Sequence, residues 1–279
     1  MARADARAQA GDIVVWSATL DQSRPDWVGL LDADEASRYR SFRSDADRHR
    51  FLLGATLARA AVCWAFGGNV DDVILDRTCD RCGGPHGRVR ATGSNAGLSI
   101  SHSGDRVLVA VNPLGPVGVD IERIDESRDL VGVARRVMRG PEYEAWHALA
   151  KDARPRALTM CWARKEAALK YTGDGLRVPM RDLEVTTPDR PAALLSWSGR
   201  PDMTAEVGLT DLDIDPAYAA CLAHPRQCRP RVWPAQRLLA PLGLLPHVRS
   251  RPGDTTVDAH HVRTSASGRR GVGPTGRRE

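Results

Sequence analysis

Short stretches rich in Val, Ile and Leu alternate with longer stretches of helical period over the first 225 residues of this chain. The former predict strands, and the longest of them cover residues 12–20, 98–103, 107–111 and 117–124, with shorter ones near 193–197 and 218–222. The latter predict two long helices, from about Ser44 to Gly67 and from about Ala157 to Gly173, each ended by glycine. The pattern therefore favours a mixed fold in which strands and helices alternate.

The chain divides into two comparable parts before and after about Leu114, although no repeat is detectable in the residues themselves. Its composition changes beyond about His224, where seven of the 18 Pro fall together with Arg, Gly and Ser. Such a composition buries little apolar surface. We therefore expect residues 224–279 to form a mostly disordered tail, and a chain that ends after about Pro225 to fold.

The net charge of +5 is unevenly distributed. Eleven Arg and three acids lie from His224 onward, which gives the tail +8, so residues 1–223 carry 29 basic and 32 acidic side chains and a charge of −3. A basic disordered segment would bind nucleic acid without sequence preference, and this is an alternative function. It holds one Trp and no Phe or Tyr for base stacking, so nucleic acid is not the expected partner.

No stretch approaches the roughly 20 apolar residues that a membrane span needs, and the first residues lack the apolar region of a secretory signal. Six cysteines scattered over 279 residues do not indicate a disulfide framework. We expect a protein of the cytoplasm that does not enter the membrane.

Lysine is scarce, because only residues 151, 165 and 170 are Lys while Arg is abundant. Lys165 and Lys170 fall in the second predicted helix, where Glu166 and Lys170 share a face. An ordinary pair of Glu and Lys one turn apart explains this spacing. A site that needs a compact ammonium rather than a planar guanidinium explains it as well.

Two acidic residues share one face of a predicted strand. Period two places Asp120 and Glu122 together with Gly118, opposite Val119 and Ile121. A solvated outer face is one interpretation, and a site for a hard divalent cation is the other, because Mg²⁺ takes few carboxylates together with water and phosphate oxygens.

Two further motifs carry reactive side chains. Ser101 and His102 are adjacent, so on a strand they point to opposite faces, and the chain has no GxSxG motif, which disfavours a hydrolase. Cys79, Cys82 and His86 form half of a zinc site that Cys63 or Cys228 could complete. A reduced loop without metal and a redox pair are the other interpretations of these cysteines.

The motifs SISHS from Ser99, GVDIERI from Gly118 and WARKEAALK from Trp162 occur in this order, after SFRSDADRHRFLLG from Ser41. Together they resemble the 4′-phosphopantetheinyl transferases of the large, surfactin-synthetase-activating type over about residues 12–223. The resemblance implies an α+β fold, a pseudo-dimer of two similar α/β halves with the active site in the cleft between them. The halves would be residues 12–115, on the adenine and 3′-phosphate side of coenzyme A, and residues 116–223, with the metal and catalytic motifs.

The implied reaction is the transfer of phosphopantetheine from coenzyme A to a serine of an acyl or peptidyl carrier protein, with release of adenosine 3′,5′-bisphosphate. By this resemblance Asp120, Glu122 and Glu166 would hold Mg²⁺ or Mn²⁺, Glu166 would take the serine proton, and Lys170 would lie on the pyrophosphate. The remaining coenzyme A contacts would be Arg38, Arg50, Gly84, Pro85, Ser101, His102 and Lys165, with Asp120 shared through the metal. We expect a monomer that serves polyketide or nonribosomal peptide synthesis, with a non-catalytic carrier-binding relative as a further alternative.

Overall fold

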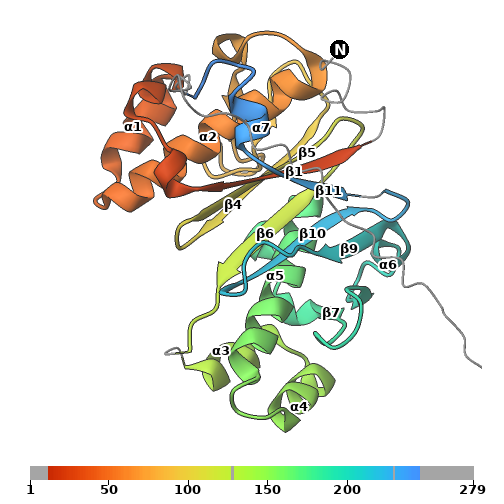
Figure 1. Ribbon diagram of the computed structural model, residues 1–279. Coiled ribbons are helices and arrows are strands. Elements are labelled where there is room, and N and C mark those ends of the chain that lie inside the picture. The colour runs from red at the N-terminus through yellow and green to blue at the C-terminus, as the bar shows by residue number, and fades with distance from the viewer. Residues whose placement is uncertain (1–11, 127–128, 229, 246–279) are drawn as a thin grey trace, which may run out of the picture. The chain divides into compact units, whose positions relative to one another are not determined.

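Two β-sheets lie at the centre of the protein, as the computed structural model shows (Figure 1). The structure describes residues 12–126, 129–228 and 230–245. The first sheet has the strand order β11, β1, β5, β4, in which β1 is parallel to β11 and antiparallel to β5, and β5 is antiparallel to β4. The strands are β1 (Ile13–Thr19), β4 (Gly97–Ser103), β5 (Arg106–Asn112) and β11 (Pro230–Pro234).

The second main sheet is antiparallel and has the order β6, β10, β9. Its strands are β6 (Gly118–Arg123), β9 (Val207–Asp211) and β10 (Tyr218–Pro225). Two small antiparallel pairs complete the described strands: β2 (Leu75–Asp76) with β3 (Arg90–Ala91), and β7 (Leu183–Val185) with β8 (Leu194–Trp197).

The two longest helices each cover one main sheet. They are α2 (Asp45–Phe66), which packs on the first sheet, and α5 (Arg154–Thr172), which packs on the second. The shorter helices are α1 (Ala33–Ser41), α3 (Leu130–Val137), α4 (Gly140–Ala148), α6 (Met203–Glu206) and α7 (Gln236–Leu239). Short segments of 3-10 helix occur at Leu20–Gln22, Pro25–Leu30, Val70–Asp72, Gly175–Arg177 and Met180–Asp182.

The central strands are buried on both faces, which explains their continuous apolar runs. In β1, Val14 and Trp16 pack towards α2, whereas Ile13 and Val15 pack in a core with β6 and β10. Successive side chains of a strand point to opposite faces, so one strand serves two cores. A third core lies between α5 and the second sheet. The layers are therefore a helix, two sheets and a second helix.

Serine side chains of β4 join the two sheets. The hydroxyl oxygens of Ser99, Ser101 and Ser103 accept hydrogen bonds from the backbone amides of Val119, Ile121 and Arg123 at 2.9, 3.2 and 3.0 Å. These amides lie on the edge of β6 that pairs with no strand among the described residues. Buried amides need acceptors, and serine at every second position supplies them. The ladder fixes the register of the second sheet against the first.

Most expected elements are confirmed within a few residues. The predicted strands correspond to β1, β4, β5, β6, β8 and β10, and the predicted helices to α2 and α5, which end at Gly67 and Gly173. The mixed α and β fold is confirmed as well. Among the described residues, no helix combines the length and the apolar character needed to span a membrane.

The structure corrects the expected start of the tail. Residues 230–234 form β11 at an edge of the first sheet, where the missing amides of Pro230 and Pro234 are tolerated. The following helix α7 buries Leu238 and Leu239 against α2. A chain that ends after about Pro225 would lose these contacts, so we expect it to be less stable than the full chain. The rest of the expected tail, residues 246–279, lies outside the described residues.

Candidate active site

The strand β6 crosses the helix α5 at a glycine. A Cβ atom placed on Gly118 would fall on the backbone of Ala167 and Tyr171 and within 3.0 Å of the carbonyl carbon of Lys170. Only glycine lets the two backbones approach this closely. Because side chains at every second position of a strand share a face, Asp120 lies next along the surface that β6 turns towards α5.

Asp120 is buried with one oxygen bonded and the other free. Its Oδ1 accepts hydrogen bonds from Lys170 Nζ at 2.7 Å and from Ser101 Oγ at 2.8 Å. Its Oδ2 is also buried and has no hydrogen-bond partner. A buried carboxylate oxygen without a partner is destabilising by about 1–3 kcal/mol or more. A cation bound at Oδ2 would remove this penalty.

Two further carboxylates lie near Asp120. Glu166 of α5 is only 9% exposed, and burial raises the pKa of its carboxyl group. The charges of Asp120 and Glu122 raise this pKa further, while the charge of Lys170 lowers it. Glu122 accepts a hydrogen bond from Ser103 Oγ at 3.0 Å. Three acidic groups thus share one electrostatic environment, with a single lysine among them.

This cluster fits a hard divalent ion that keeps part of its water. The oxygens of the three carboxylates are not all within 4.8 Å of one another, so they do not form a closed cage. Mg²⁺ commonly uses one or two carboxylates and completes its shell with water and phosphate oxygens. The unpartnered Oδ2 of Asp120 and the spacing of the acids both agree with this preference.

Positive groups gather beside the carboxylates. Loss of hydration lowers the pKa of the His102 imidazole, and the nearby charges of Lys170 and Arg50 lower it further. Arg50 donates from Nε to the carbonyl oxygen of Gly104 at 2.7 Å and forms an ion pair with Asp47. Since like charges are held together here, an anionic ligand would relieve their repulsion.

A cleft of about 640 Å³ opens next to Lys170. One wall comes from residues 77–100 and the other from residues 170–177, and the lining includes the cations Arg77, Arg88, Lys170 and Arg177. Burial lowers the pKa of the Arg77 and Arg88 guanidinium groups. Half-buried cations that face a cleft suit a polyanionic ligand such as a nucleotide.

The expected adenine loop lies near this cleft and is held by Arg38. Arg38 NH1 donates to the carbonyl oxygen of Pro85 at 3.1 Å, and its guanidinium group lies over the ring of Phe51. The neighbouring residues His86 and Gly87 line the cleft. The structure thus brings Arg38, Gly84 and Pro85 to one side of the cleft.

Lys165 is not brought to this site. Its side chain is fully buried, and Nζ donates to the carbonyl oxygen of Val137 at 2.8 Å and to Glu142 Oε2 at 2.6 Å. Glu142 also accepts a hydrogen bond from the backbone amide of Val185 at 2.9 Å. Lys165 therefore links α5 to α4 and β7, and we leave it out of the proposed site.

Three arginines that line the cleft are not among the site residues expected from the sequence. Arg77 and Arg88 flank the Cys79–His86 loop, and Arg177 follows α5. The signal that could have found the first two is the density of Arg around a Gly-rich loop, which favours anion binding. Nothing in the sequence places Arg177 near them.

Clustered carboxylates, one lysine and a cationic cleft are features of enzymes that act on phosphate-containing substrates, and they favour that class for this mixed α and β protein. Comparison with known proteins specifies the class. The model of the 4′-phosphopantetheinyl transferase superfamily matches residues 116–223.

Known relatives match a larger part of the chain. The 4′-phosphopantetheinyl transferase HetI of Nostoc sp. is 30% identical over 194 residues, which cover 67% of this chain and 81% of the relative. The 4′-phosphopantetheinyl transferase psf-1 of Bacillus pumilus is 30% identical over 208 residues, or 74% and 83% of the two chains. A 4′-phosphopantetheinyl transferase of Bacillus subtilis is 28% identical over 203 residues, or 72% and 86%.

The chain therefore belongs to the 4′-phosphopantetheinyl transferase superfamily. Its activity is the transfer of phosphopantetheine from coenzyme A to carrier proteins.

Proposed function

We propose that this transferase is of the large, surfactin-synthetase-activating type and that the cluster around Asp120 is its catalytic site. The observation that carries the proposal is the incomplete bonding of Asp120, whose Oδ1 is held by Lys170 and Ser101 while the buried Oδ2 lacks a partner. The motifs that resemble this type supply all three residues. The Bacillus relatives, aligned over most of their length, also support the assignment.

The pseudo-dimer follows as part of this proposal. Residues 12–115 supply three of the four strands of the first sheet and α2, which covers it, whereas residues 116–223 supply nearly all of the second sheet and α5, which covers it. Each half thus pairs one sheet with one long helix. After the second half, the chain returns to the first half, where β11 pairs with β1 and α7 packs in the core beside α2.

Asp120, Glu122 and Glu166 would hold Mg²⁺, and Mn²⁺ accepts the same set of oxygens. When bound, the ion would neutralise charge that develops on the diphosphate of coenzyme A. Lys170 supplies a second positive charge to the same diphosphate from the mouth of the cleft. Its side chain is 28% exposed, so it reaches a ligand without leaving Asp120.

Glu166 is the proposed base. The serine Oγ of the carrier forms a bond to the β-phosphorus of coenzyme A, and the bond from that phosphorus to the adenosine bisphosphate breaks. The serine proton passes to a Glu166 carboxylate oxygen, directly or through one water. Burial and the neighbouring acids raise the pKa of Glu166, which makes its carboxylate a stronger base than an exposed one.

The nucleotide end of coenzyme A would lie among the remaining cations. Arg50 and His102 are proposed to contact the 3′-phosphate, and the loop with Gly84 and Pro85, held by Arg38, to lie along the adenine. Ser101 has a different role, because its single hydroxyl hydrogen is already donated to Asp120. We propose that Ser101 positions Asp120 rather than donating to phosphate.

The setting of the enzyme is also a proposal. All six cysteines are free thiols, which supports a reducing cytoplasm. A monomer that serves carriers of polyketide or nonribosomal peptide synthesis fits the proposed type.

The test is the intact mass of an apo carrier protein after incubation with this protein, coenzyme A and Mg²⁺. We expect a gain of about 340 Da, the mass of phosphopantetheine, on one serine. Glu166→Gln should abolish the gain and keep measurable binding of coenzyme A. A mass that stays unchanged with several carriers would refute the proposal and leave the non-catalytic carrier-binding alternative.

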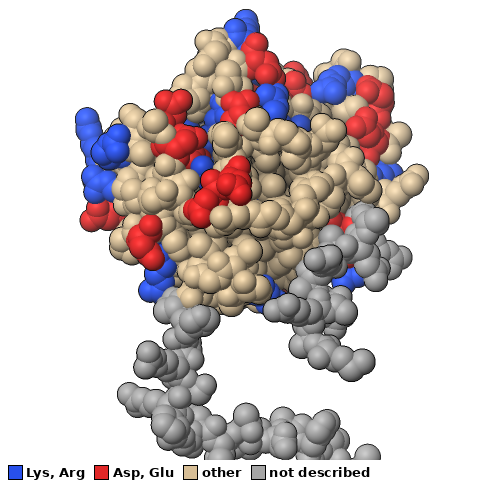
Figure 2. Space-filling model, turned by 90° about the horizontal axis from the view of Figure 1, so that it is seen from above, with Lys and Arg blue, Asp and Glu red and all other residues tan. Residues whose placement is uncertain are grey.

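The nucleic-acid alternative has little support in the described residues. Viewed from above, Lys and Arg side chains are interspersed with Asp and Glu on this face (Figure 2). A sequence-independent nucleic-acid surface needs a continuous field of positive charge. Salt-dependent binding of a nucleic acid, retained in Glu166→Gln, would revive that alternative.

A further inference from the structure

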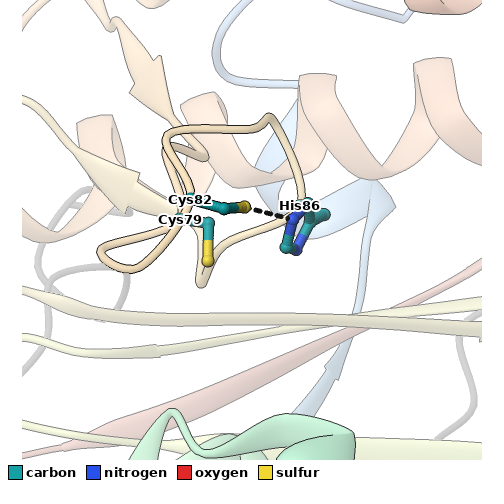
Figure 3. A group of neighbouring side chains, drawn as sticks. All are labelled: Cys79, Cys82 and His86. Carbon is teal, nitrogen blue, oxygen red and sulfur yellow. Dashed lines mark hydrogen bonds between the residues drawn. The ribbon is translucent and has the colours of Figure 1, made fainter.

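Three potential metal ligands outside the carboxylate cluster lie close together in one loop. Cys79 and Cys82, with His86 four residues further on, offer Sγ and imidazole nitrogen atoms that all lie within 4.8 Å of one another (Figure 3). Among the described residues, no other group of three His, Cys, Asp or Glu side chains is this close. The other cysteines, including Cys63 and Cys228, do not join the group.

We propose that Cys79, Cys82 and His86 bind one Zn²⁺ ion, with solvent at the fourth position. Two thiolates and one imidazole are the donors that zinc prefers, and three protein ligands leave one position of a tetrahedron open. This site is separate from the carboxylate cluster, which is made of hard oxygen donors unsuited to a thiophilic ion.

The loop needs little movement to bind the ion. Cys82 Sγ and His86 Nε2 are 2.9 Å apart in a hydrogen bond. Around a tetrahedral zinc with ordinary bond lengths the same atoms would be about 3.5 Å apart. The distance between the two atoms would therefore increase by roughly 0.6 Å. Rotation of the side chains can supply this change, because both are exposed.

Backbone hydrogen bonds preform the loop. The amide of Cys79 donates to the carbonyl oxygen of Gly84 at 2.8 Å, and the amide of Gly83 donates to that of Cys79 at 2.9 Å. Gly83 has φ = 71°, which favours glycine. These contacts hold Cys79 close to Gly83 and Gly84 without help from an ion.

Strand pairing and hydrogen bonds also hold the two ends of the loop. The strands β2 and β3 pair beneath it, and Arg90 of β3 holds both oxygens of Asp80 at 3.0 and 2.7 Å, between the two cysteines. The amide of Gly87 donates to the carbonyl oxygen of Arg77 at 2.7 Å. Such outer contacts orient ligands before the ion arrives.

The site is placed to influence the nucleotide cleft. Cys79 and His86 line the same cleft as Lys170 and Arg88. Zinc would tie the two ends of the loop that carries Gly84 and Pro85. Because the bound ion would reduce the conformational freedom of the loop, zinc should tighten the binding of adenosine 3′,5′-bisphosphate about threefold or more. This effect on nucleotide binding rests on the proposed function, whereas the metal site itself does not.

The test uses the full chain, freed of metal with a chelator under reductant and then titrated with Co²⁺ as a probe for Zn²⁺. We expect thiolate-to-cobalt absorption that saturates at one ion per chain and is displaced by Zn²⁺ but not by Mg²⁺. Elemental analysis after zinc loading should give one zinc per chain. Absence of the cobalt–thiolate absorption would overturn the proposal.

Variants identify the ligands. Cys82→Ser and His86→Asn should weaken zinc binding at least about tenfold, while Cys228→Ser, which removes a thiol outside the loop, should bind like the parent protein. Circular dichroism checks that each variant is folded, and the titration of the parent needs no variant at all. Unchanged affinity in Cys82→Ser, or lost affinity in Cys228→Ser, would contradict the assignment.

Measurements of nucleotide binding distinguish the zinc site itself from its effect on the affinity for nucleotide. Calorimetry with adenosine 3′,5′-bisphosphate, with and without zinc, measures the coupling, while the cobalt spectrum reports the site whether or not a nucleotide binds. Zinc that binds without changing nucleotide affinity would overturn the coupling and confirm the site. Nucleotide that does not bind in either state would count against the proposed function alone.

Discussion

Two lysines of α5 each pair with a carboxylate from another element, and the two pairs differ in how many of their atoms are hydrogen-bonded. Lys165 and Glu142 are 2.6 Å apart and buried, and both oxygens of Glu142 accept further hydrogen bonds from backbone amides. Lys170 and Asp120 are 2.7 Å apart, but Lys170 is partly exposed and Asp120 Oδ2 has no partner. The first pair is complete as it stands. The second retains bonding capacity for a ligand.

The comparison distinguishes an ion pair that stabilises the fold from one whose charges are available to a ligand. A buried ion pair whose atoms are all hydrogen-bonded holds elements together and gains nothing from a ligand. A pair with an unpartnered oxygen beside a cationic cleft gains when a cation and a phosphate arrive. The predictions below test this difference.

The largest effect is expected for Asp120→Asn. The substitution removes a proposed metal ligand and the charge partner of Lys170, so kcat/KM for transfer should fall about 10³-fold, or roughly 4 kcal/mol of transition-state stabilisation. The free energy of unfolding should change by less than about 1 kcal/mol, because Asn keeps an oxygen that accepts from Lys170 and Ser101 and carries no buried charge. Steady-state kinetics and urea unfolding measure the two quantities. Retained activity would remove Asp120 from the site.

Glu142→Gln should act in the opposite way. It leaves the buried ammonium of Lys165 without a charge partner, which should lower the free energy of unfolding by about 3 kcal/mol. Transfer by the folded fraction should remain close to that of the parent protein. Urea unfolding at fixed pH gives the stability, and a stability equal to the parent would contradict the structural role.

Gly118→Ala tests the crossing that positions Asp120. A methyl group there would collide with the backbone of α5, so we expect a loss of stability of about 2 kcal/mol. Transfer activity should fall as well, because α5 carries Glu166 and Lys170. Gly140→Ala is a matched control, since nothing lies within 4 Å of the added carbon there. Equal behaviour of the two variants would show that the close approach is unimportant.

The smallest effect is expected for the serine ladder. Ser101→Ala and Ser99→Ala each remove the acceptor of one buried amide, so both should lower stability by about 1 kcal/mol. Only Ser101 also holds Asp120, so only Ser101→Ala should reduce kcat/KM, by about tenfold. A reduction of the same size in Ser99→Ala would show that the ladder acts through the fold alone.

The sequence predicts the strands and long helices well because their signals are local. Apolar runs such as Val14–Trp16 and the glycines at 67 and 173 mark elements directly. The capping box of Asp32 and Glu35 is also a local signal, and it marks the start of α1, a helix that the apolar pattern alone does not predict. β11 gave no local signal, since its Pro-rich composition resembles a disordered segment and only pairing with β1 makes it a strand.

The site is less predictable because it depends on separation in space. Helical geometry places Lys165 and Lys170 about 140° apart around α5, so the two lysines face different surroundings. The resemblance to a family nonetheless assigned both to coenzyme A. The period of two along residues 99–103 could have revealed the serine ladder, whereas the meeting of Arg77 and Arg177 required the fold.

A direct test of the central claim compares Lys165→Met with Lys170→Met in the same two assays, urea unfolding and carrier modification followed by intact mass. We predict that Lys165→Met lowers the free energy of unfolding by about 3 kcal/mol or more with activity per folded molecule preserved. Lys170→Met should lose about 10²-fold or more in transfer rate, with a smaller loss of stability than Lys165→Met, because Lys170 is partly exposed although Asp120 loses its charge partner. If both variants lost activity and stability to the same extent, the distinction between the two pairs would be wrong.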